Sequence, residues 1–103
     1  MKIIEHNIKE LTNILVIHKV EELSAFGSLV NDNFNEESDL DFVVSFTEMI
    51  EEEFASDFFS LEDELQRLFA RDVDLCIYED IIGSQFWEGI KNDLVQIYQN
   101  PKK

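Results

Sequence analysis

The sequence contains few residues that interrupt regular secondary structure. Its 103 residues include only three glycines and one proline, Pro101, so there is little room for flexible linkers. We find no internal repeat and no low-complexity segment. The length is typical of one small domain. We therefore expect a single domain over residues 1–103, ending in a short disordered tail at about residues 100–103.

The chain also lacks a second cysteine and a long apolar run. With Cys76 as the only cysteine, no intrachain disulfide can form, which is typical of a reducing compartment. Cys76 lies in an apolar run and is expected to be a buried small hydrophobic residue. No apolar stretch approaches the roughly 20 residues of a membrane span, and the N-terminus lacks the apolar core of a signal peptide. We expect a cytoplasmic protein with no membrane partner.

Positive charge is scarce. Eight lysines and arginines stand against 23 aspartates and glutamates, which gives a net charge of −15, and the only arginines are Arg67 and Arg71. Proteins that bind nucleic acid duplexes use Lys and Arg to displace counterions from phosphates, so bulk nucleic-acid binding is excluded. The acidic surface favours a basic protein partner or serves solubility alone.

Hydrophobic residues make up 45% of the chain, and their spacing predicts alternating helices and strands. Apolar residues at helical spacing predict one helix over residues 4–18 and a second that is clearest over 57–70. Residues 48–53 belong either to the first turns of that second helix or to an acidic loop. Shorter patterns predict strands over 22–26, 39–46, 73–78 and 95–98, a turn or short helical turn over 28–35, and a short helix over 85–92.

This order of elements predicts an α+β fold. The helix that connects the second and third strands should make those two strands parallel. The short connection between the first two strands allows them to run antiparallel. We therefore expect a small mixed β-sheet with helices packed mainly on one face.

The most informative motif is a glycine and serine followed by two closely spaced aspartates. Gly27 lies at the end of the first predicted strand and Ser28 begins the turn; nine residues follow, and then come Ser38, Asp39, Leu40 and Asp41. Side chains at positions i and i+2 of a strand share one face, so Asp39 and Asp41 should stand side by side. Two carboxylates at such a short distance repel each other unless a cation lies between them. A hard divalent metal ion is the natural candidate for that cation.

A third acid is expected to complete the site. Asp74 lies in the third strand, which reaches the same cleft if it neighbours the second strand. Asp72 shares a strand face with Asp74 and is the alternative, although the apolar residues that flank Asp74 favour the latter. Asp39 and Asp41 could also be solvated charges on an edge strand.

A glycine at the end of the first strand allows a tight turn and a close approach of a ligand to the backbone. Ser28 then offers a hydroxyl and an N–H group to an anion, and a helical turn after it would present further N–H groups to phosphate. Three carboxylates beside a phosphate-binding turn predict phosphoryl transfer with two metal ions.

These residues resemble the pattern of the minimal nucleotidyltransferase (MNT) domain of the DNA polymerase β-like nucleotidyltransferase superfamily. The pattern is Gly-Ser, a loop of about ten residues, Ser-Asp-x-Asp and a third Asp on a later strand. The resemblance spans nearly the whole chain and implies a nucleotidyltransferase-like fold. It implies that Asp39 and Asp41 coordinate Mg²⁺, with two ions expected, and that Asp74 is the third ligand or the base. Gly27 and Ser28 would contact the phosphates of ATP or another nucleoside triphosphate, and Ser38 would mainly orient the turn.

The sequence departs from this family in the loop after Ser28. Relatives often carry Ala-Arg-Gly where this chain has Val30, Asn31 and Asp32. An arginine that can pair with phosphate is therefore replaced by an amide. The three carboxylates remain, so metal binding is expected to survive better than fast transfer.

The resemblance implies an enzyme that transfers a nucleoside monophosphate, with AMP from ATP favoured, to a hydroxyl group. MNT proteins often act as antitoxins beside a HEPN-domain RNase toxin, and some of them modify a tyrosine of the toxin. The expected partner is therefore a HEPN-type toxin, and small-molecule acceptors are less favoured. The alternative is a non-catalytic acidic antitoxin that neutralises a basic HEPN partner by forming a complex.

Overall fold

The computed structural model describes residues 1–31, 34–47 and 51–101. The helices are α1 (Lys2–His6), α2 (Ile8–Ile17), α3 (Glu51–Phe69), α4 (Tyr78–Ile81) and α5 (Gln85–Ile90). The strands are β1 (Val20–Phe26), β2 (Leu40–Phe46), β3 (Val73–Ile77) and β4 (Val95–Gln99), and a 3₁₀ turn, η1 (Gly27–Val30), follows β1. No helix in the described ranges combines the length and the apolar composition that crossing a membrane requires.

The strands form one mixed sheet in the order β3-β2-β1-β4. The pair β2 and β3 is parallel, as the connecting helix α3 predicts, whereas β1 runs antiparallel to both β2 and β4. The α+β class and the mixed sheet are therefore confirmed. The central position of β1 and β2 explains why their apolar runs are the most deeply buried.

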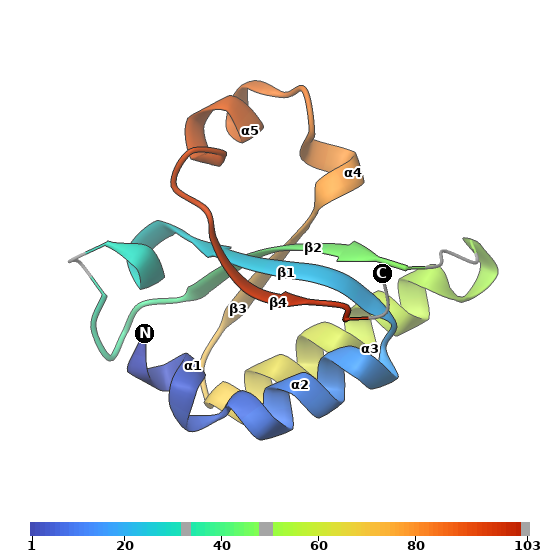
Figure 1. The fold of residues 1–103 in the computed structure, drawn as a ribbon, viewed down its shortest axis with the longest axis horizontal. Helices are drawn as coiled ribbons and strands as arrows, with labels where there is room; N and C mark the ends of the chain where they lie inside the picture. The colour runs from blue at the N-terminus through green and yellow to red at the C-terminus, as the bar shows by residue number, and fades with distance from the viewer. Residues whose placement is uncertain (32–33, 48–50, 102–103) are drawn as a thin grey trace.

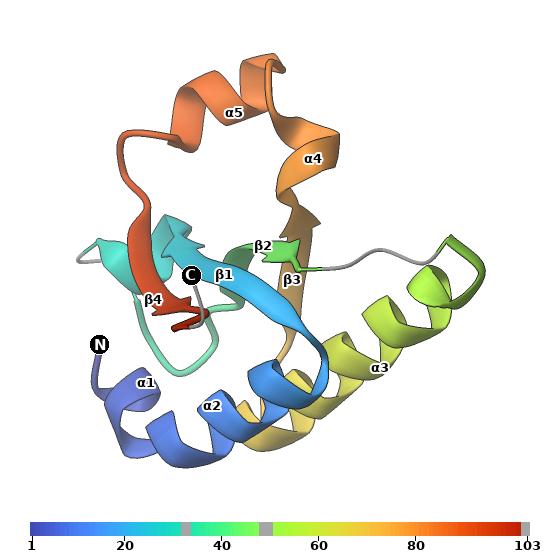
Figure 2. The same ribbon diagram turned by 45° about the vertical axis from the view of Figure 1, so that its right-hand side comes forward.

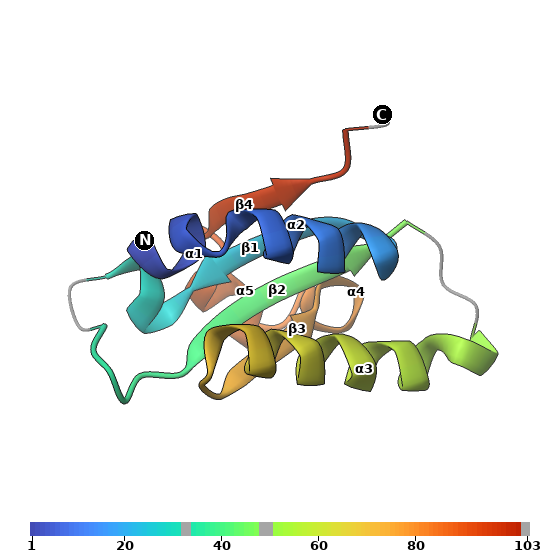
Figure 3. The same cartoon turned by 90° about the horizontal axis from the view of Figure 1, so that it is seen from below.

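Helices α1, α2 and α3 cover one face of the sheet (Figure 3). Leu11 and Leu15 of α2 and Leu61 and Leu65 of α3 are fully buried there against alternate residues of β1 and β2. The short helices α4 and α5 rise from the opposite side of the sheet (Figures 1 and 2). This second face is less completely covered, and it carries the candidate site.

Two of the predicted elements differ from the observed ones. The expected helix over residues 4–18 is divided at Asn7, whose side chain donates a hydrogen bond to the Ile3 carbonyl oxygen at 2.8 Å. A side chain that bonds to the backbone in this way competes with regular helical pairing. Tyr78 was predicted to end the third strand, but it begins α4, an element that has too few residues to show a periodic pattern.

The remaining boundaries agree with the predictions to within a few residues, which is the usual scatter at the ends of elements. Helix α3 begins at Glu51, so residues 51–53 belong to the helix. Residues 48–50 lie outside the described residues, as do residues 102–103 of the expected tail and residues 32–33 of the expected turn.

The packing of α3 leads to a stability prediction. Leu65 is fully buried, so Leu65→Ala should lower the free energy of unfolding by about 2–5 kcal/mol through lost burial and a residual cavity. Phe59 lies on the same helix but is 65% exposed, so Phe59→Ala should change it by less than about 0.5 kcal/mol. Urea denaturation of both variants measures the difference, and equal losses would contradict this assignment of the core.

Candidate functional site

The alternation of β2 places acidic and polar side chains on the open face of the sheet. Leu40, Phe42 and Val44 point into the core that α2 and α3 cover. Asp41 therefore lies on the opposite face, and Asp39, two residues earlier, is expected on that same face. The candidate site consequently forms on the side of the sheet where α4 and α5 stand.

The parallel pairing of β2 and β3 brings the late aspartate to the same place. Asp41 and Asp74 are directly paired in the register of the two strands. Burial raises the pKa of Asp41 from 3.8 to about 6, and the charge of Asp74, a hydrogen bond from Asp74 and the charge of Asp39 add to the rise. All three carboxyl groups predicted from the sequence therefore interact electrostatically at one point of the sheet.

The chemistry of these groups fits a hard divalent cation. The charge of Asp74 helps to raise the pKa of Asp41, so Asp41 keeps its proton to a higher pH than an isolated carboxyl group does. A cation can replace that proton and relieve the repulsion. Within the ranges that the structure describes, no three acidic, imidazole or thiol side chains are already arranged to ligate an ion together. Asp39 and Asp74 are exposed, so their side chains have space to change rotamer.

Gly27 is required by the position of Asp41. Its φ angle is +70°, and a Cβ atom at this position would lie 2.5 Å from Oδ2 of Asp41. Both the backbone conformation and the contact exclude a side chain. Gly27 thus lets the carboxylate of β2 lie against the end of β1, and it is adjacent to Asp41 because Phe26 is the strand partner of Asp41.

Ser28 lies in the short turn that follows Gly27. The expected helical turn is a 3₁₀ turn of four residues, in which the Ser28 carbonyl oxygen accepts a hydrogen bond from the Asn31 N–H. A cavity of about 490 Å³ opens beside this turn and is lined by residues that include Gly27, Val30 and Asn31. The predicted phosphate contacts of Gly27 and Ser28 would lie at this side of the carboxylates.

Arg71 is a site-forming residue that the motif does not indicate. Its Nη1 donates hydrogen bonds to the carbonyl oxygens of Asn35 and Ser38, each at 3.0 Å, and its guanidinium lies 4.8 Å from the ring centre of Phe34. The Ser38 hydroxyl accepts a hydrogen bond from the Asn35 N–H. Ser38 therefore orients the turn before β2, and Arg71 anchors the same turn. The only available signal was that Arg71 is one of two arginines in the chain.

Two other expectations about β3 can be compared with the structure. Asp72 is exposed, and its carbonyl oxygen accepts a hydrogen bond from the Leu40 N–H at 3.0 Å, which fixes the start of the parallel pairing. The groups that act on Asp41 are Asp74 and Asp39. Cys76 was predicted to be buried, but it is half-buried on the open face, because alternation along β3 places it on the side of Asp74. Burial and then the charges of Asp74 and Asp41 raise the pKa of its thiol.

Comparison with known proteins places this geometry among nucleotidyltransferases. Residues 9–103 match the family model described as "Polymerase beta, Nucleotidyltransferase". The "Putative protein adenylyltransferase MJ0128" of Methanocaldococcus jannaschii is 33% identical over 98 residues, which cover 87% of this chain and 97% of that protein.

Solved structures with the same fold include proteins of toxin–antitoxin systems. A toxin–antitoxin crystal structure with AMP-PNP matches with a TM-score of 0.67 at 18% identity, covering 90% of this chain and 73% of that chain. The structure of the tri-AMPylated Shewanella oneidensis HEPN toxin in complex with MNT antitoxin matches with a TM-score of 0.64 at 17% identity, covering 93% and 72%. At these identities the two matches show a common fold.

The raised pKa of Asp41 predicts a pH-dependent gain in stability for Asp41→Asn. Ionisation of Asp41 is unfavourable in the folded state. The protonated Asp41 side chain therefore contributes most to folding stability below the ordinary pKa of 3.8, and this contribution is lost as the pH rises through about 6. Without divalent cations, Asp41→Asn should raise stability at about pH 7.5 by on the order of 1 kcal/mol after solvent screening. The difference should shrink at about pH 4. Thermal denaturation at both pH values checks this, and a gain that does not vary with pH would contradict it.

The contact between Gly27 and Asp41 is tested with a second glycine as control. Gly27 and Gly83 both have positive φ angles, but a Cβ at Gly83 would meet nothing within 4 Å. Each Gly→Ala change should therefore carry a backbone penalty of about 1–2 kcal/mol, to which Gly27→Ala adds the clash with the carboxylate. The melting temperature of Gly27→Ala should be the lower of the two. In an Asp41→Ala background this extra loss should disappear, and its persistence would refute the proposed contact.

Proposed function

The chain belongs to the "Polymerase beta, Nucleotidyltransferase" family, and from this premise we propose that it is an Mg²⁺-dependent enzyme that transfers AMP from ATP to a hydroxyl group of a partner protein. The observation that supports the proposal is that Asp41 lies against Gly27, pairs with Asp74 across the two parallel strands and is affected by the charges of Asp74 and Asp39. The charges of Asp74 and Asp39 help to raise the pKa of Asp41, and a cation bound between these groups would relieve that repulsion. The resemblance to a protein adenylyltransferase supports AMP as the transferred group.

The residues have separate roles in this reaction. Asp39, Asp41 and Asp74 would hold Mg²⁺, and two ions are expected. The bound metal would neutralise charge on the triphosphate and on the leaving group. Gly27 and Ser28 would bind the phosphates from the end of β1. The acceptor oxygen forms a bond to the α-phosphorus while the bond from that phosphorus to the bridging oxygen breaks. Pyrophosphate leaves, and the hydroxyl proton passes to Asp74.

We further propose that the acceptor is a HEPN-type toxin. Structures with this fold include an MNT antitoxin in complex with a tri-AMPylated HEPN toxin. The net charge of −15 would also attract a basic protein partner. A second candidate function, neutralisation by complex formation without transfer, is favoured by Asn31, which stands where relatives often carry an arginine.

One experiment separates the two functions. The protein is incubated with the toxin-like product of a neighbouring gene, Mg²⁺ and ATP labelled at the α-phosphate. We expect label on the partner and a loss of about a hundredfold or more in rate for the double variant Asp39→Asn and Asp41→Asn. Asp57→Asn removes the same charge from an exposed position of α3 and should transfer normally.

The outcomes are distinct. Label that depends on Mg²⁺ and on both aspartates supports the enzyme. Neutralisation of the toxin by the double variant, without label from either protein, supports the binding module and overturns the proposed transfer. Calorimetric titration of Mg²⁺ and ATP into wild-type protein and Asp41→Asn gives an independent readout of the metal site.

A further inference from the structure

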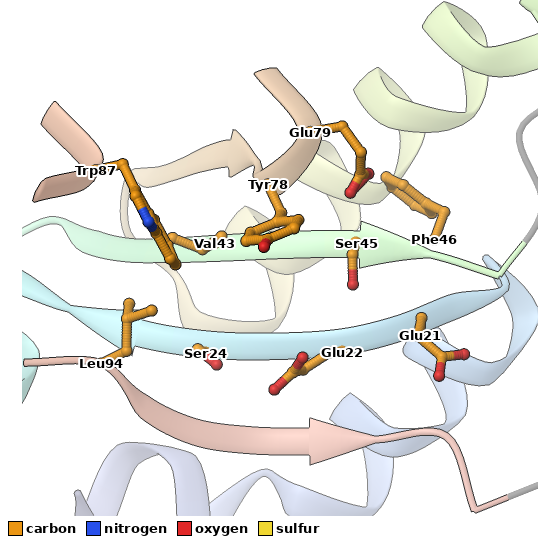
Figure 4. Close-up of a pocket in the computed structure, with 10 residues that line it drawn as sticks. All are labelled: Glu21, Glu22, Ser24, Val43, Ser45, Phe46, Tyr78, Glu79, Trp87 and Leu94. Atoms are coloured by element: carbon orange, nitrogen blue, oxygen red, sulfur yellow. The ribbon is translucent and has the colours of Figure 1, made fainter. Parts of the chain in front are cut away.

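A cavity of about 400 Å³ lies on the open face of the sheet, beyond the carboxylates of the candidate site. Val43 and Ser45 of β2 form part of its floor, two and four residues after Asp41 on the same strand face. Tyr78 and Glu79, which directly follow β3, and Trp87 of α5 form its opposite wall (Figure 4). The cavity and the three carboxylates therefore share one continuous surface.

The walls of this cavity combine negative charge with aromatic rings. Glu21, Glu22 and Glu79 line it, and the lining residues that the structure describes include no lysine or arginine. The rings of Tyr78 and Trp87 meet edge to face, with centres 5.2 Å apart. Carboxylates beside the faces of aromatic rings are the groups that recognise guanidinium and ammonium ions.

Ser24 provides a separate indication that the cavity binds a polar group. It lines the floor, and its residue is only 7% exposed. Its neighbours Leu23 and Ala25 point into the core, so its side chain faces the cavity. Within the described part of the chain, no hydrogen bond to the Ser24 hydroxyl is found. The residue is largely buried, but its hydroxyl is not among the buried side-chain atoms that lack a partner in the described residues, so it stays accessible from the cavity to a donor group of a bound molecule.

The charges that line the cavity beside Trp87 and the cavity beside Gly27 favour different substrates for the two cavities. A nucleoside triphosphate carries several negative charges, which three glutamates would repel. The cavity beside Gly27 contains one acidic residue, Asp93, and the glycine that lets a ligand approach the backbone. Burial raises the pKa of the Glu79 carboxyl, although a backbone hydrogen bond opposes the rise. A cation that approaches Glu79 would stabilise its charged form.

We propose that the cavity formed by Glu22, Ser24, Glu79 and Trp87 binds an arginine or lysine side chain of the acceptor protein and so selects hydroxyl groups that lie near a basic residue. This inference rests on the proposed function, because it assigns specificity to that reaction. The basic side chain would lie against the aromatic rings and donate hydrogen bonds to the glutamates and the Ser24 hydroxyl. The neighbouring acceptor hydroxyl would then stand beside Asp74, at the end of the surface where the carboxylates converge.

A binding experiment without nucleotide tests the cavity by itself. Trp87 is the only tryptophan of the chain, so its fluorescence reports on this site directly. The probes are short peptides that contain one tyrosine and one arginine, and matched peptides in which uncharged citrulline replaces arginine. We expect the arginine peptides to bind about tenfold more tightly than the citrulline peptides. Glu22→Gln and Glu79→Gln should each reduce this ratio of affinities. Glu10→Gln removes the same charge at an exposed position of α2 and should leave the ratio unchanged.

A transfer experiment with the same peptides distinguishes failure of the cavity from failure of the enzyme. Preferential labelling of arginine peptides by wild-type protein, lost in Glu79→Gln, supports both proposals. Arginine-dependent binding without transfer to the peptides supports the proposed role of the cavity, and the toxin-labelling experiment then decides separately whether the protein is an enzyme. Equal binding and equal labelling of both peptides overturn the proposed role of the cavity but leave the proposed transferase activity intact. If ATP changes the Trp87 fluorescence and the peptides do not, the proposed role of the cavity is also overturned, because the nucleoside would then occupy the cavity.

Discussion

The contact between Asp41 and Asp74 is the constraint on which the rest of the structure depends. The two carboxyl groups are 33 residues apart in the sequence and meet at one register position, where the charge of Asp74 helps to raise the pKa of Asp41. Such crowding is unfavourable when both groups are charged, so the remaining structure must hold it in place. The buried residues of α2 and α3 fix the two strands from the opposite face, and Gly27 leaves the space that the Asp41 carboxylate occupies.

The sequence predicted the parts of this site that depend on short-range patterns. Asp39 and Asp41 share a strand face at a spacing of two residues, and the turn glycine lies at the end of an apolar run. The position of Asp74 required one further inference, that α3 makes β2 and β3 parallel, and periodicity was sufficient to identify that helix. Each of these features is set by residues that are close in the sequence or by a regular connection.

The features that the sequence did not predict depend on contacts between distant residues. Arg71 reaches back to the carbonyl oxygens of Asn35 and Ser38, and backbone acceptors leave no mark in a sequence. The exposure of Cys76 depends on how completely α4 and α5 cover the open face, which residue types do not determine. Tyr78 has the apolar character of a strand residue, but it begins a helix because the chain must turn away from the sheet there.

The anchoring of the turn by Arg71 links two regions that would otherwise open independently. Arg71 lies two residues before β3, and the carbonyl oxygens that it binds precede β2. One side chain therefore connects the segments that lead into these two strands. Regions joined in this way tend to open together as one cooperative unit. Local fraying at the end of α3 would therefore release Asp39 at the same moment. Order at the face that carries the candidate site consequently depends on the hydrogen bonds of the Arg71 guanidinium to two backbone carbonyl oxygens.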